Sequence, residues 1–356
     1  MTSTALRPGE VAARIVGIAT HLPEAVLGND DLAAEFPEWP AAKILEKTGI
    51  RERRVAAADE TAGDLAAAAA IKLFEKLAIA PDSVDFLILC TQAPDYILPT
   101  TACILQDRLG LTTGVGAIDI NLGCSGFVYG LSIATGLIAA GAAHRVLLLT
   151  ADTYSKYIGA GDKSVRTLFG DGAAATLVQG CAPDEGRIGP FVFGTDGSGA
   201  HSLIVPAGGF RTPRSAATAE VSHDKSGNSR SSNNLYMHGG DVLSFSLREV
   251  PRAIYALCGK DGIEIDDYDA LVLHQANKFM LDSLQKKLAV SAEKIPRYFE
   301  DVGNTVSSTI PFVLERLWTT EGCSHPRRLM LVGFGVGLSW AAASIKLSDD
   351  SGRYCE

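Results

Sequence analysis

Hydrophobic and polar positions follow one another along the chain in a pattern that predicts an α/β protein. Short, almost wholly apolar segments such as Val84–Cys90 and Arg145–Thr150 predict buried strands of a parallel sheet, which is covered on both faces. Longer segments with helical spacing, including Thr61–Leu77 and Phe127–Ala139, alternate with these strands. A chain that alternates in this way favours a layered fold with parallel strands.

Two polar segments interrupt the pattern. Residues 210–234 are rich in Ser, Asn, Arg and Thr, which predicts a surface loop that serves as a lid or is simply flexible. The segment Arg51–Arg54 places three arginines beside the small turn at Gly49, where the guanidinium groups are either solvated or available to hold a phosphate.

The two halves of the chain resemble each other. The strand that ends at Cys90 matches the one that ends at His274, and Leu147–Leu149 matches Leu329–Leu331. Between them, the segment that starts at Asn121 matches the one that starts at Asn304, and the separation between matched positions stays nearly constant. This order predicts two copies of one strand–helix unit, whose equivalent strand ends meet near a pseudo-two-fold axis.

Cys124 is the candidate nucleophile. It lies in a small-residue turn between the predicted strand Gly116–Ile120 and the helix Phe127–Ala139. The positive end of a helix dipole favours a thiolate, which is the form that attacks carbonyl groups. The duplication adds His274 and Asn304 at related strand ends, the sheet edge where α/β proteins place their chemistry. Without these partners, a buried cysteine, a core histidine and a turn asparagine would be the simpler interpretations.

Composition and charge narrow the class of protein. The chain has 356 residues, of which 47% are hydrophobic and 21% charged, as in an ordinary globular protein with room for two halves. A net charge of −9 argues against nucleic-acid binding. The seven cysteines form no Cys-x-x-Cys pair, so neither a disulfide framework nor a zinc site is predicted. We expect a cytoplasmic protein, since no signal peptide, lipidation motif or membrane span is evident.

Six motifs, taken in order, give the chain a specific resemblance. It resembles the β-ketoacyl-acyl carrier protein (ACP) synthase III family of the thiolase superfamily along almost its full length. The motifs are TGIRERR at residues 48–54, NLGCSGF at 121–127, FGDGA at 169–173, HQAN at 274–277, GNT at 303–305 and GFGVG at 333–337.

The resemblance implies a fold and an assembly. The fold is thiolase-like, with two duplicated βαβαβαββ-type halves packed as a layered α-β-α-β-α sandwich. Residues 1–180 would form the half with the nucleophilic cysteine, and residues 181–356 the half with the histidine and asparagine. The resemblance also implies a homodimer, in which the loop Ile97–Pro99 of one subunit lines the acyl pocket of the other, with Leu98 at the position where relatives often carry Phe.

The resemblance also implies a reaction. Cys124 would take an acyl group from an acyl-thioester, with the backbone N–H groups of Cys124 and Gly335 holding the oxyanion. Malonyl-ACP or malonyl-CoA would then lose CO2, and His274 and Asn304 would stabilise its enolate. The result is a decarboxylative Claisen condensation in fatty-acid or secondary-metabolite synthesis. This chemistry needs no metal or redox cofactor, because CoA and ACP thioesters are the substrates.

Binding residues and departures from the family follow from the same motifs. In relatives, tryptophan and arginine side chains pack against the CoA adenine at positions where this chain has Lys43, Lys47 and Lys163. A lysine does not stack on a ring or form bidentate contacts as an arginine does. The resemblance assigns substrate binding to Thr48, Leu98, Lys163, Gly239 and Asn277, and the docking of ACP to Lys278, Lys286 and Lys287.

Four alternatives remain open at the level of sequence. One is an acyltransferase that delivers the acyl group to an alcohol or amine. A second is a condensing enzyme of secondary metabolism with a different donor or acceptor. A catalytically silent partner subunit is disfavoured by the presence of Cys124, His274 and Asn304 together. A thiol protease also uses Cys, His and Asn, but within a different sequence context.

Overall fold

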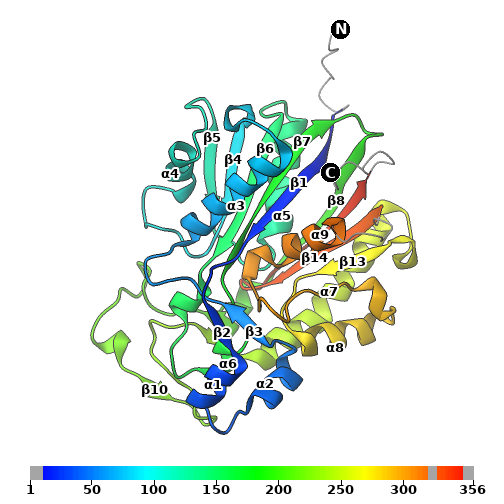
Figure 1. The fold of residues 1–356 in the computed structure, drawn as a ribbon. Coiled ribbons are helices and arrows are strands. Elements are labelled where there is room, and N and C mark those ends of the chain that lie inside the picture. The colour runs from blue at the N-terminus through cyan, green and yellow to red at the C-terminus, as the bar shows by residue number, and fades with distance from the viewer. Residues whose placement is uncertain (1–10, 320–326, 348–356) are drawn as a thin grey trace.

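The framework of the protein is a pair of mixed β-sheets (Figure 1). The computed structural model describes residues 11–319 and 327–347. In the first sheet the central strands β6 and β4 run parallel to each other and to β5, while β7 is antiparallel to both of its neighbours. Its strand order is β1 (Ala12–His21), β7 (Gly172–Cys181), β6 (Arg145–Asp152), β4 (Phe86–Cys90) and β5 (Gly116–Ile120).

The second sheet repeats the first. Its order is β13 (Ala270–Leu273), β14 (Arg328–Gly335), β15 (Ser339–Leu347) and β8 (Gly186–Thr195). The pair β13–β14 is parallel, and the two further pairings are antiparallel, as in the run β4–β6–β7–β1. The predicted duplication is thereby confirmed. Among the described residues, however, the second sheet has no counterpart of β5, and residues near Asn304 contribute only an isolated bridge to Phe169.

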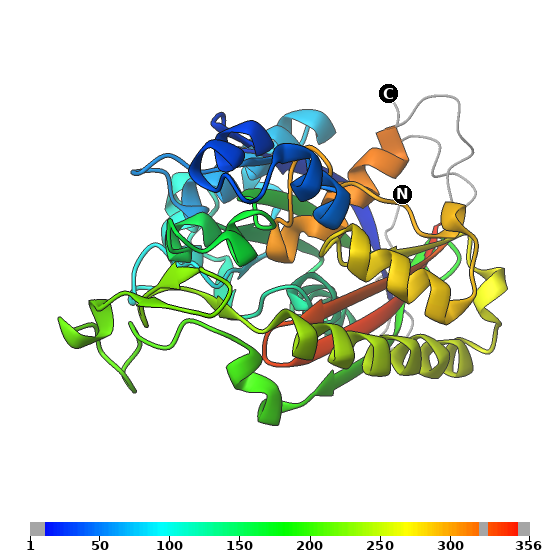
Figure 2. The same cartoon turned by 90° about the horizontal axis from the view of Figure 1, so that it is seen from below.

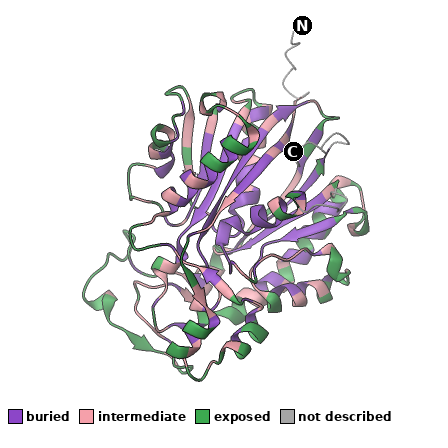
Figure 3. Cartoon of the chain, viewed as in Figure 1, coloured by how far each residue is buried: buried purple, intermediate pink, exposed green. Residues whose placement is uncertain are grey.

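Helices fill the space between the sheets and cover their outer faces (Figures 1 and 3). The central layer consists of α5 (Gly126–Ala139) and α9 (Thr309–Thr319), whose apolar side chains share one buried cluster with both sheets. On the outer faces lie α3 (Ala62–Leu77) with α4 (Thr101–Arg108), and α7 (Gly239–Asp261) with α8 (Lys278–Leu288). This is the predicted α-β-α-β-α order. Each fully buried Leu, Ile or Phe in these layers contributes about 1.5–3 kcal/mol.

Helix α5 owes its central position to its sequence. Its residues are nearly all apolar or small, so the helix can be buried on every side. Gly130 lets it approach the first sheet closely, because a Cβ atom there would lie 2.6 Å from Leu148 Cδ1. The helix that carries the candidate nucleophile at its start is therefore clamped between the two sheets.

The remaining elements gather at one end of the molecule, below the sheets in Figure 1. These smaller elements are β2 (Val26–Gly28), α1 (Asn29–Glu35), α2 (Ala41–Thr48), β3 (Glu52–Arg54), α6 (Lys163–Arg166), β9 (Leu203–Ile204), β10 (Ser222–His223), β11 (Ser229–Arg230) and β12 (Tyr236–Met237).

None of the helices in the described ranges is long and apolar enough to cross a membrane.

The polar segment 210–234 lies on the surface, as predicted, and extends outward from one side of the molecule (Figure 2, yellow-green). It includes the short hairpin β10–β11. Arg230 anchors this hairpin through ion pairs to Asp162 at 2.7 Å and to Asp224 at 3.0 Å. The contact with Asp162 holds the segment against the body of the protein, whereas the contact with Asp224 lies within the segment and stabilises the hairpin.

The arginines of residues 51–54 serve the fold rather than a phosphate. Arg53 is fully buried, and its guanidinium donates to the Leu27 and Thr167 carbonyls and to Asn29 Oδ1, at 2.9–3.0 Å. The other two are occupied as well, since Arg51 pairs with Glu300 and Asp301 and Arg54 donates to the carbonyls of residues 23 and 24. These contacts favour a structural role over the phosphate-binding alternative.

Candidate active site

The turn that holds Cys124 lies where the two halves of the protein touch. It follows β5 and leads into α5, and Gly126 N–H closes it by donating to the Gly123 carbonyl at 2.8 Å. Strand β14 of the other half packs directly against it. A Cβ atom at Gly335 would lie 2.8 Å from Cys124 Sγ, and one at Gly333 would lie 2.7 Å from the Cys124 carbonyl oxygen. Both positions therefore require glycine.

Cys124, His274 and Asn304 line one small cavity of about 70 Å³. All three side chains are buried, with 4%, 2% and 4% of their surfaces exposed. The structure therefore brings together the three residues that the duplication and the resemblance selected. The rest of the lining is mostly apolar and consists of Leu168, Phe169, Leu203, Met237, Gly239, Val242, Ala276, Asn277, Met280, Phe334 and Gly335.

His274 is held as a neutral imidazole. It follows the end of β13, and burial lowers its pKa to about 3. Its Nδ1 lies 2.7 Å from Thr309 Oγ1, and the ring of Phe334 meets the imidazole edge-on at a centroid distance of 5.5 Å. Thr309 Oγ1 also donates to the Val306 carbonyl at 3.2 Å. The hydroxyl proton can therefore point either to the imidazole or to this carbonyl, and each choice selects a different tautomer.

Asn304 lines the cavity with its side-chain oxygen engaged, which leaves its amide N–H groups as the available donors. Its Oδ1 accepts a hydrogen bond from Val306 N–H at 2.9 Å, so the oxygen is held within the loop. The backbone of Asn304 is fixed to the segment around Phe169, because it donates to Leu168 O at 2.9 Å and accepts from Gly170 N–H at 3.0 Å. Val306 has a φ of +54°, a strained conformation for a β-branched residue and typical of functional loops.

The surroundings of Cys124 favour the protonated thiol, whereas the position at a helix start favoured a thiolate. Burial raises its pKa to about 12, and the negative charge of Asp152 adds to this effect. The backbone N–H groups of Val336 and of Cys124 itself face the sulfur and act in the opposite direction. Desolvation outweighs the end of the helix here, because the sulfur is shielded from water.

In the glycine-rich turn, the backbone N–H that faces the sulfur belongs to Val336, one residue after the predicted donor Gly335. Gly335 is still part of β14 and pairs with Ser339 of β15, so its backbone belongs to the sheet. Val336 is the first residue beyond the strand, and its N–H is the one that faces the sulfur. The Val336 N–H is therefore the group that the turn offers to the sulfur, whereas the missing side chain of Gly335 leaves the space that the thiol occupies.

Asp152 is a buried carboxylate at the end of β6. It accepts hydrogen bonds from Gln92 N–H at 2.9 Å, from Ser307 N–H at 3.3 Å and from Ser307 Oγ at 2.5 Å. These contacts connect the loop after β4 with the loop that holds Asn304. Burial raises the pKa of Asp152 to about 7, although these hydrogen bonds favour its charged form.

Replacing Asp152 with Asn should lower the pKa of the Cys124 thiol. The wild-type carboxylate is ionised above about pH 7, where its charge opposes formation of the thiolate. We expect alkylation of Cys124 by iodoacetamide, mapped by peptide mass spectrometry, to be about tenfold faster in Asp152→Asn between pH 8 and 9, which corresponds to about one pKa unit. The two proteins should react alike below pH 7. Superimposable profiles across the whole range would contradict this electrostatic coupling.

The Asp152→Asn substitution should also change the stability of the folded state. The change should have the opposite sign to the one expected when a carboxylate in a salt bridge is replaced. The folded state keeps the Asp152 proton up to about pH 7, whereas the unfolded chain releases it near pH 4. The folded state therefore loses stability as the pH rises from about 4 through 7. Above pH 7, the folded form of Asp152→Asn should be more stable than the wild type, provided that the hydrogen bonds around residue 152 are kept.

Two of the five residues assigned to substrate binding, Gly239 and Asn277, line the catalytic cavity. The other three do not. Thr48 is buried and bonds to the Ile44 carbonyl at 2.7 Å. Lys163 is also buried, and its ammonium donates to Ser226 O at 2.8 Å and pairs with Glu38 at 3.1 Å, so it anchors the 210–234 segment. Leu98 is 79% exposed on the protein surface.

The lysines assigned to carrier docking lie on α8, next to the catalytic cavity. Lys278 begins this helix directly after Asn277 and pairs with Asp282 at 2.5 Å. Lys286 and Lys287 are exposed in its last turn. Helix α8 thus connects a cavity-lining residue with two solvent-facing positive charges.

Sequence reasoning missed four residues of the site: Asp152, Thr309, Val336 and Tyr154. Asp152 was detectable as the one charged residue that ends the apolar run 146–152. Val336 lies inside a motif that the sequence had already singled out, one residue from the predicted donor. Thr309 and Tyr154 carry no signal of their own, because only the fold brings them to the cavity region.

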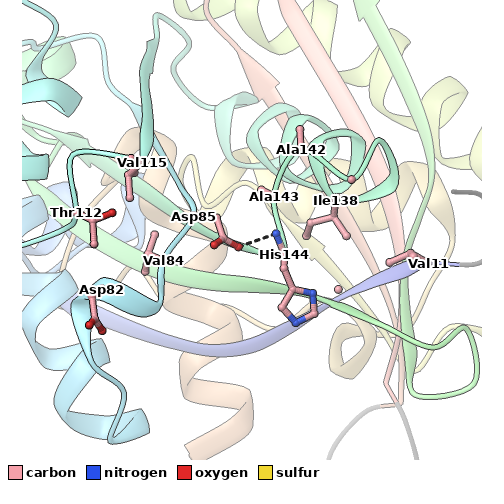
Figure 4. A pocket seen from close by; sticks show the side chains of 13 residues that line it. Val11, Asp82, Val84, Asp85, Thr112, Val115, Ile138, Ala142, Ala143 and His144 are labelled. Atoms are coloured by element: carbon pink, nitrogen blue, oxygen red, sulfur yellow. Dashed lines mark hydrogen bonds between the residues drawn. The ribbon is translucent and has the colours of Figure 1, made fainter. Parts of the chain in front are cut away.

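A separate cleft of about 690 Å³ lies at the amino ends of β4, β5 and β6, opposite the edge that carries Cys124 (Figure 4). Asp85, which lines it, accepts hydrogen bonds from the backbone N–H groups of His144 and Arg145, both at 2.7 Å. The Asp85 carboxylate therefore serves to join strand ends. None of the predicted site residues lies there.

Comparison with known proteins identifies the family. Residues 118–197 match the family described as 3-oxoacyl-[acyl-carrier-protein] synthase III, and residues 258–347 match its C-terminal part. The β-ketoacyl-[acyl-carrier-protein] synthase III of Caldanaerobacter subterraneus subsp. tengcongensis is 34% identical over 95% of this chain and 99% of its own.

Solved structures agree with the sequence comparison. A crystal structure of a 3-oxoacyl-(acyl-carrier-protein) synthase III is 59% identical, with a TM-score of 0.93 over 94% of this chain and 100% of that one. The priming β-ketosynthase of the R1128 polyketide pathway is 28% identical, with a TM-score of 0.80 over 98% and 99% of the two chains. With its duplicated fold and its Cys, His and Asn residues around one cavity, the chain belongs to the β-ketoacyl-[acyl-carrier-protein] synthase III family.

Proposed function

We propose that the protein condenses an acyl-thioester with a malonyl-thioester through an acyl group carried on Cys124. The observation that carries this proposal is the shared cavity. It places a buried thiol, a neutral imidazole and an amide donor together, with two backbone N–H groups facing the sulfur. This set suits acyl transfer followed by stabilisation of an enolate, and the relatives are named for the same reaction class.

The first half-reaction forms the acyl-enzyme. Cys124 Sγ attacks the carbonyl carbon of the acyl-thioester and gives its proton to Nε2 of His274. This requires the tautomer in which Nδ1–H donates to Thr309 Oγ1. The oxyanion lies at the N–H groups of Cys124 and Val336, each worth about 3 kcal/mol. When the C–S bond of the donor breaks, the leaving thiolate takes the proton back from His274.

The second half-reaction forms the carbon–carbon bond. The bond between the malonyl carboxylate and the α-carbon breaks, CO2 leaves, and the electron pair forms an enolate. Its oxygen accepts hydrogen bonds from Nε2–H of His274 and from the amide of Asn304. The enolate carbon attacks the acyl-cysteine carbonyl, and the Cys124–acyl bond breaks to release a 3-oxoacyl-thioester. Cys124 leaves as a thiolate and takes up a proton, which completes the cycle.

Thr309 lets one imidazole serve both half-reactions. Decarboxylation needs Nε2–H of His274 as a donor, so the Thr309 hydroxyl must then donate to Nδ1. Acylation needs Nε2 as the proton acceptor, so Nδ1–H must then donate to the Thr309 hydroxyl, which donates in turn to the Val306 carbonyl. Thr309→Val keeps the side-chain shape and removes this hydroxyl. We expect the release of CO2 from malonyl-thioester to fall about tenfold or more in this variant, because the donor tautomer is no longer favoured.

Thr309→Ser, which retains the hydroxyl, is the matched control and should recover most of the rate. Release of CO2 can be measured directly from labelled malonyl-thioester, with thermal unfolding recorded for all three proteins. Equal rates in the valine variant and the wild type would exclude a role for Thr309 in setting the tautomer.

The partners and setting of the reaction belong to the same proposal. We assign the acyl donor to the acyl-CoA class, the extender to malonyl-ACP or malonyl-CoA, and the carrier-binding surface to Lys278, Lys286 and Lys287. Exposed lysines on α8 would attract an acidic carrier. The exposed apolar side chains Tyr96, Ile97 and Leu98 favour burial in a homodimer. The reaction is an acyl transfer in the broad sense, needs no metal or redox cofactor, and fits a cytoplasmic setting.

A second candidate is a condensing enzyme of secondary metabolism with an unusual acyl donor. It is favoured by the likeness to the priming ketosynthase of a polyketide pathway. The contacts of Lys163 favour it as well. The ammonium of this lysine is already held by Ser226 and Glu38, so the contact that relatives make with CoA adenine would be absent or altered.

The proposed function is tested by product analysis. The protein is incubated with acetyl-CoA or another short acyl-CoA, together with malonyl-ACP or malonyl-CoA. Mass spectrometry should detect the 3-oxoacyl-thioester in amounts that match the released CO2. Acyl transfer to an added alcohol or amine without release of CO2 would instead support the acyltransferase alternative.

A further inference from the structure

The loop that carries Asn304 contains a strained residue that holds the Asn304 amide in one orientation. Val306 is fully buried and has a φ of +54°. Its N–H donates to Asn304 Oδ1 at 2.9 Å. An asparagine amide that turns by 180° exchanges its oxygen, an acceptor, with its NH2 group, a donor. The Val306 N–H prevents this exchange, because only the oxygen can accept its hydrogen bond.

Two hydrogen bonds from the next residue hold Val306 in this conformation. Ser307 is buried, and its backbone N–H, at 3.3 Å, and its Oγ, at 2.5 Å, both donate to one carboxylate oxygen of Asp152. A β-branched residue keeps a positive φ only where the surrounding contacts compensate for the strain. The contacts of Ser307 provide that compensation directly beside Val306 in the chain, and an ionised carboxylate strengthens them.

The Asp152 carboxylate that accepts these bonds is itself fixed. It is the last residue of β6 and has no exposed surface. Its second oxygen accepts a hydrogen bond from the backbone N–H of Gln92 at 2.9 Å. Both oxygens of one buried carboxylate are therefore engaged, and any displacement of Ser307 would leave buried polar groups without partners, which is unfavourable.

We propose that Asp152 and Ser307 are positioning residues that act on the decarboxylation half-reaction through Asn304. The inference rests on the proposed function and assigns to it two residues that do not line the catalytic cavity. Without the contact between them, Val306 relaxes from its strained conformation and no longer fixes the Asn304 amide. The amide oxygen can then face the enolate oxygen in place of the NH2 group, and two acceptors repel each other.

Acylation of Cys124 should not depend on this series of contacts. The backbone N–H groups that face the sulfur belong to Cys124 itself and to Val336, and neither lies in the Asn304 loop. Replacing Ser307 also leaves the Asp152 carboxylate in place, which is the charged group that acts on the thiol. The two half-reactions should therefore respond differently to a change at residue 307.

The experiment measures both half-reactions of Ser307→Ala. Acylation of Cys124 by acetyl-CoA is followed by intact-protein mass spectrometry, and decarboxylation by CO2 released from labelled malonyl-CoA or malonyl-ACP. We expect acylation within about twofold of the wild type. Release of CO2 should fall about tenfold or more, in kcat rather than in KM, because the misplaced donor acts on the transition state. Ser307→Thr keeps the hydroxyl and should recover most of the rate.

Two comparisons separate positioning from general damage to the loop. Ser308→Ala removes the adjacent buried hydroxyl, which contacts Thr150 Oγ1 at 2.9 Å and the Thr150 carbonyl at 3.0 Å rather than Asp152. This variant should release CO2 within about twofold of the wild type. Asn304→Ala combined with Ser307→Ala should be no slower than Asn304→Ala alone, because Ser307 acts through Asn304. Thermal unfolding of each variant shows whether the fold is intact.

The outcomes are distinct. Wild-type release of CO2 by folded Ser307→Ala would overturn the inference, as would an equal loss in Ser308→Ala. It would also be overturned if Ser307→Ala slowed the Asn304→Ala protein by the same factor as the wild type, since Ser307 would then act independently of Asn304. None of these results touches the acyl-enzyme. A wild type that is not acylated on Cys124 and releases no CO2 would overturn the proposed function, and this inference with it.

Discussion

Replacement of Cys124 with alanine is expected to abolish the acyl-enzyme while leaving decarboxylation of malonyl-thioester intact. The variant lacks the only side chain in the cavity that can form a thioester with the acyl group, so condensation should fall by a factor on the order of 10⁵. The donors that stabilise the enolate, His274 and Asn304, remain. They are held by Thr309 and by the backbone of Val306, and neither contact involves the thiol.

Two assays on the same preparation measure this separation: intact mass after incubation with an acyl-CoA, and release of CO2 from malonyl-thioester. Cys124→Ser, which keeps a weaker nucleophile of similar size, is the matched control and should acylate slowly. Normal condensation by Cys124→Ala would show that the acyl group does not pass through this residue.

The opposite pattern is expected when the enolate donors are removed. Asn304→Ala should still be acylated on Cys124, but its release of CO2 should fall by about 10² to 10³, the cost of losing one donor to a developing oxyanion. His274→Ala should lose decarboxylation to a similar extent, and it should also acylate more slowly, because Nε2 of His274 receives the thiol proton.

Asn304→Asp distinguishes a chemical role from a structural one. Aspartate can still accept the hydrogen bond from Val306 N–H, so the loop keeps its internal contact. It has no N–H groups to offer an enolate, and its negative charge opposes one. We expect it to be as defective as Asn304→Ala in releasing CO2. A rate near that of the wild type would mean that Asn304 only orders the loop.

Much of the fold could be predicted because the two halves of the chain repeat the same strand–helix unit. The apolar run before Cys90 recurs before His274, and these two segments form β4 and β13 in equivalent positions of the two sheets. The helix from Thr61 was also predictable, since Thr61 and Asp64 form a capping box at its start. Periodicity and local capping are properties of the sequence itself, so they can be recognised without knowledge of tertiary contacts.

Elements with weak local signals were not predicted. Strand β8 contains Pro190 and several glycines, which argue against a strand, but it lies at the edge of its sheet, where a missing N–H is tolerated. Helix α9 begins Thr-Ile-Pro after a run of small polar residues. Its identity as a helix depends on its burial between the two sheets.

The identity of the catalytic residues was predictable, but their electrostatics were not. The turn at Cys124 suggested a thiolate because a helix begins there, yet the depth of burial depends on β14, which lies in the other half of the chain. The same holds for Lys163. Its sequence position suggested contact with a substrate, whereas the folded 210–234 segment occupies its ammonium. Long-range packing, which no local pattern records, decides both cases.

The central claim is that one cysteine carries the acyl group between two half-reactions, and a single pulse–chase measurement tests it most directly. Enzyme is first incubated with a short acyl-CoA and freed of excess donor, and its intact mass and modified peptide are recorded. Malonyl-thioester is then added, and the mass, released CO2 and 3-oxoacyl product are followed in time. We predict one acyl group on Cys124 that disappears as equimolar CO2 and product form. An acyl group that persists on Cys124 while product accumulates would contradict the account.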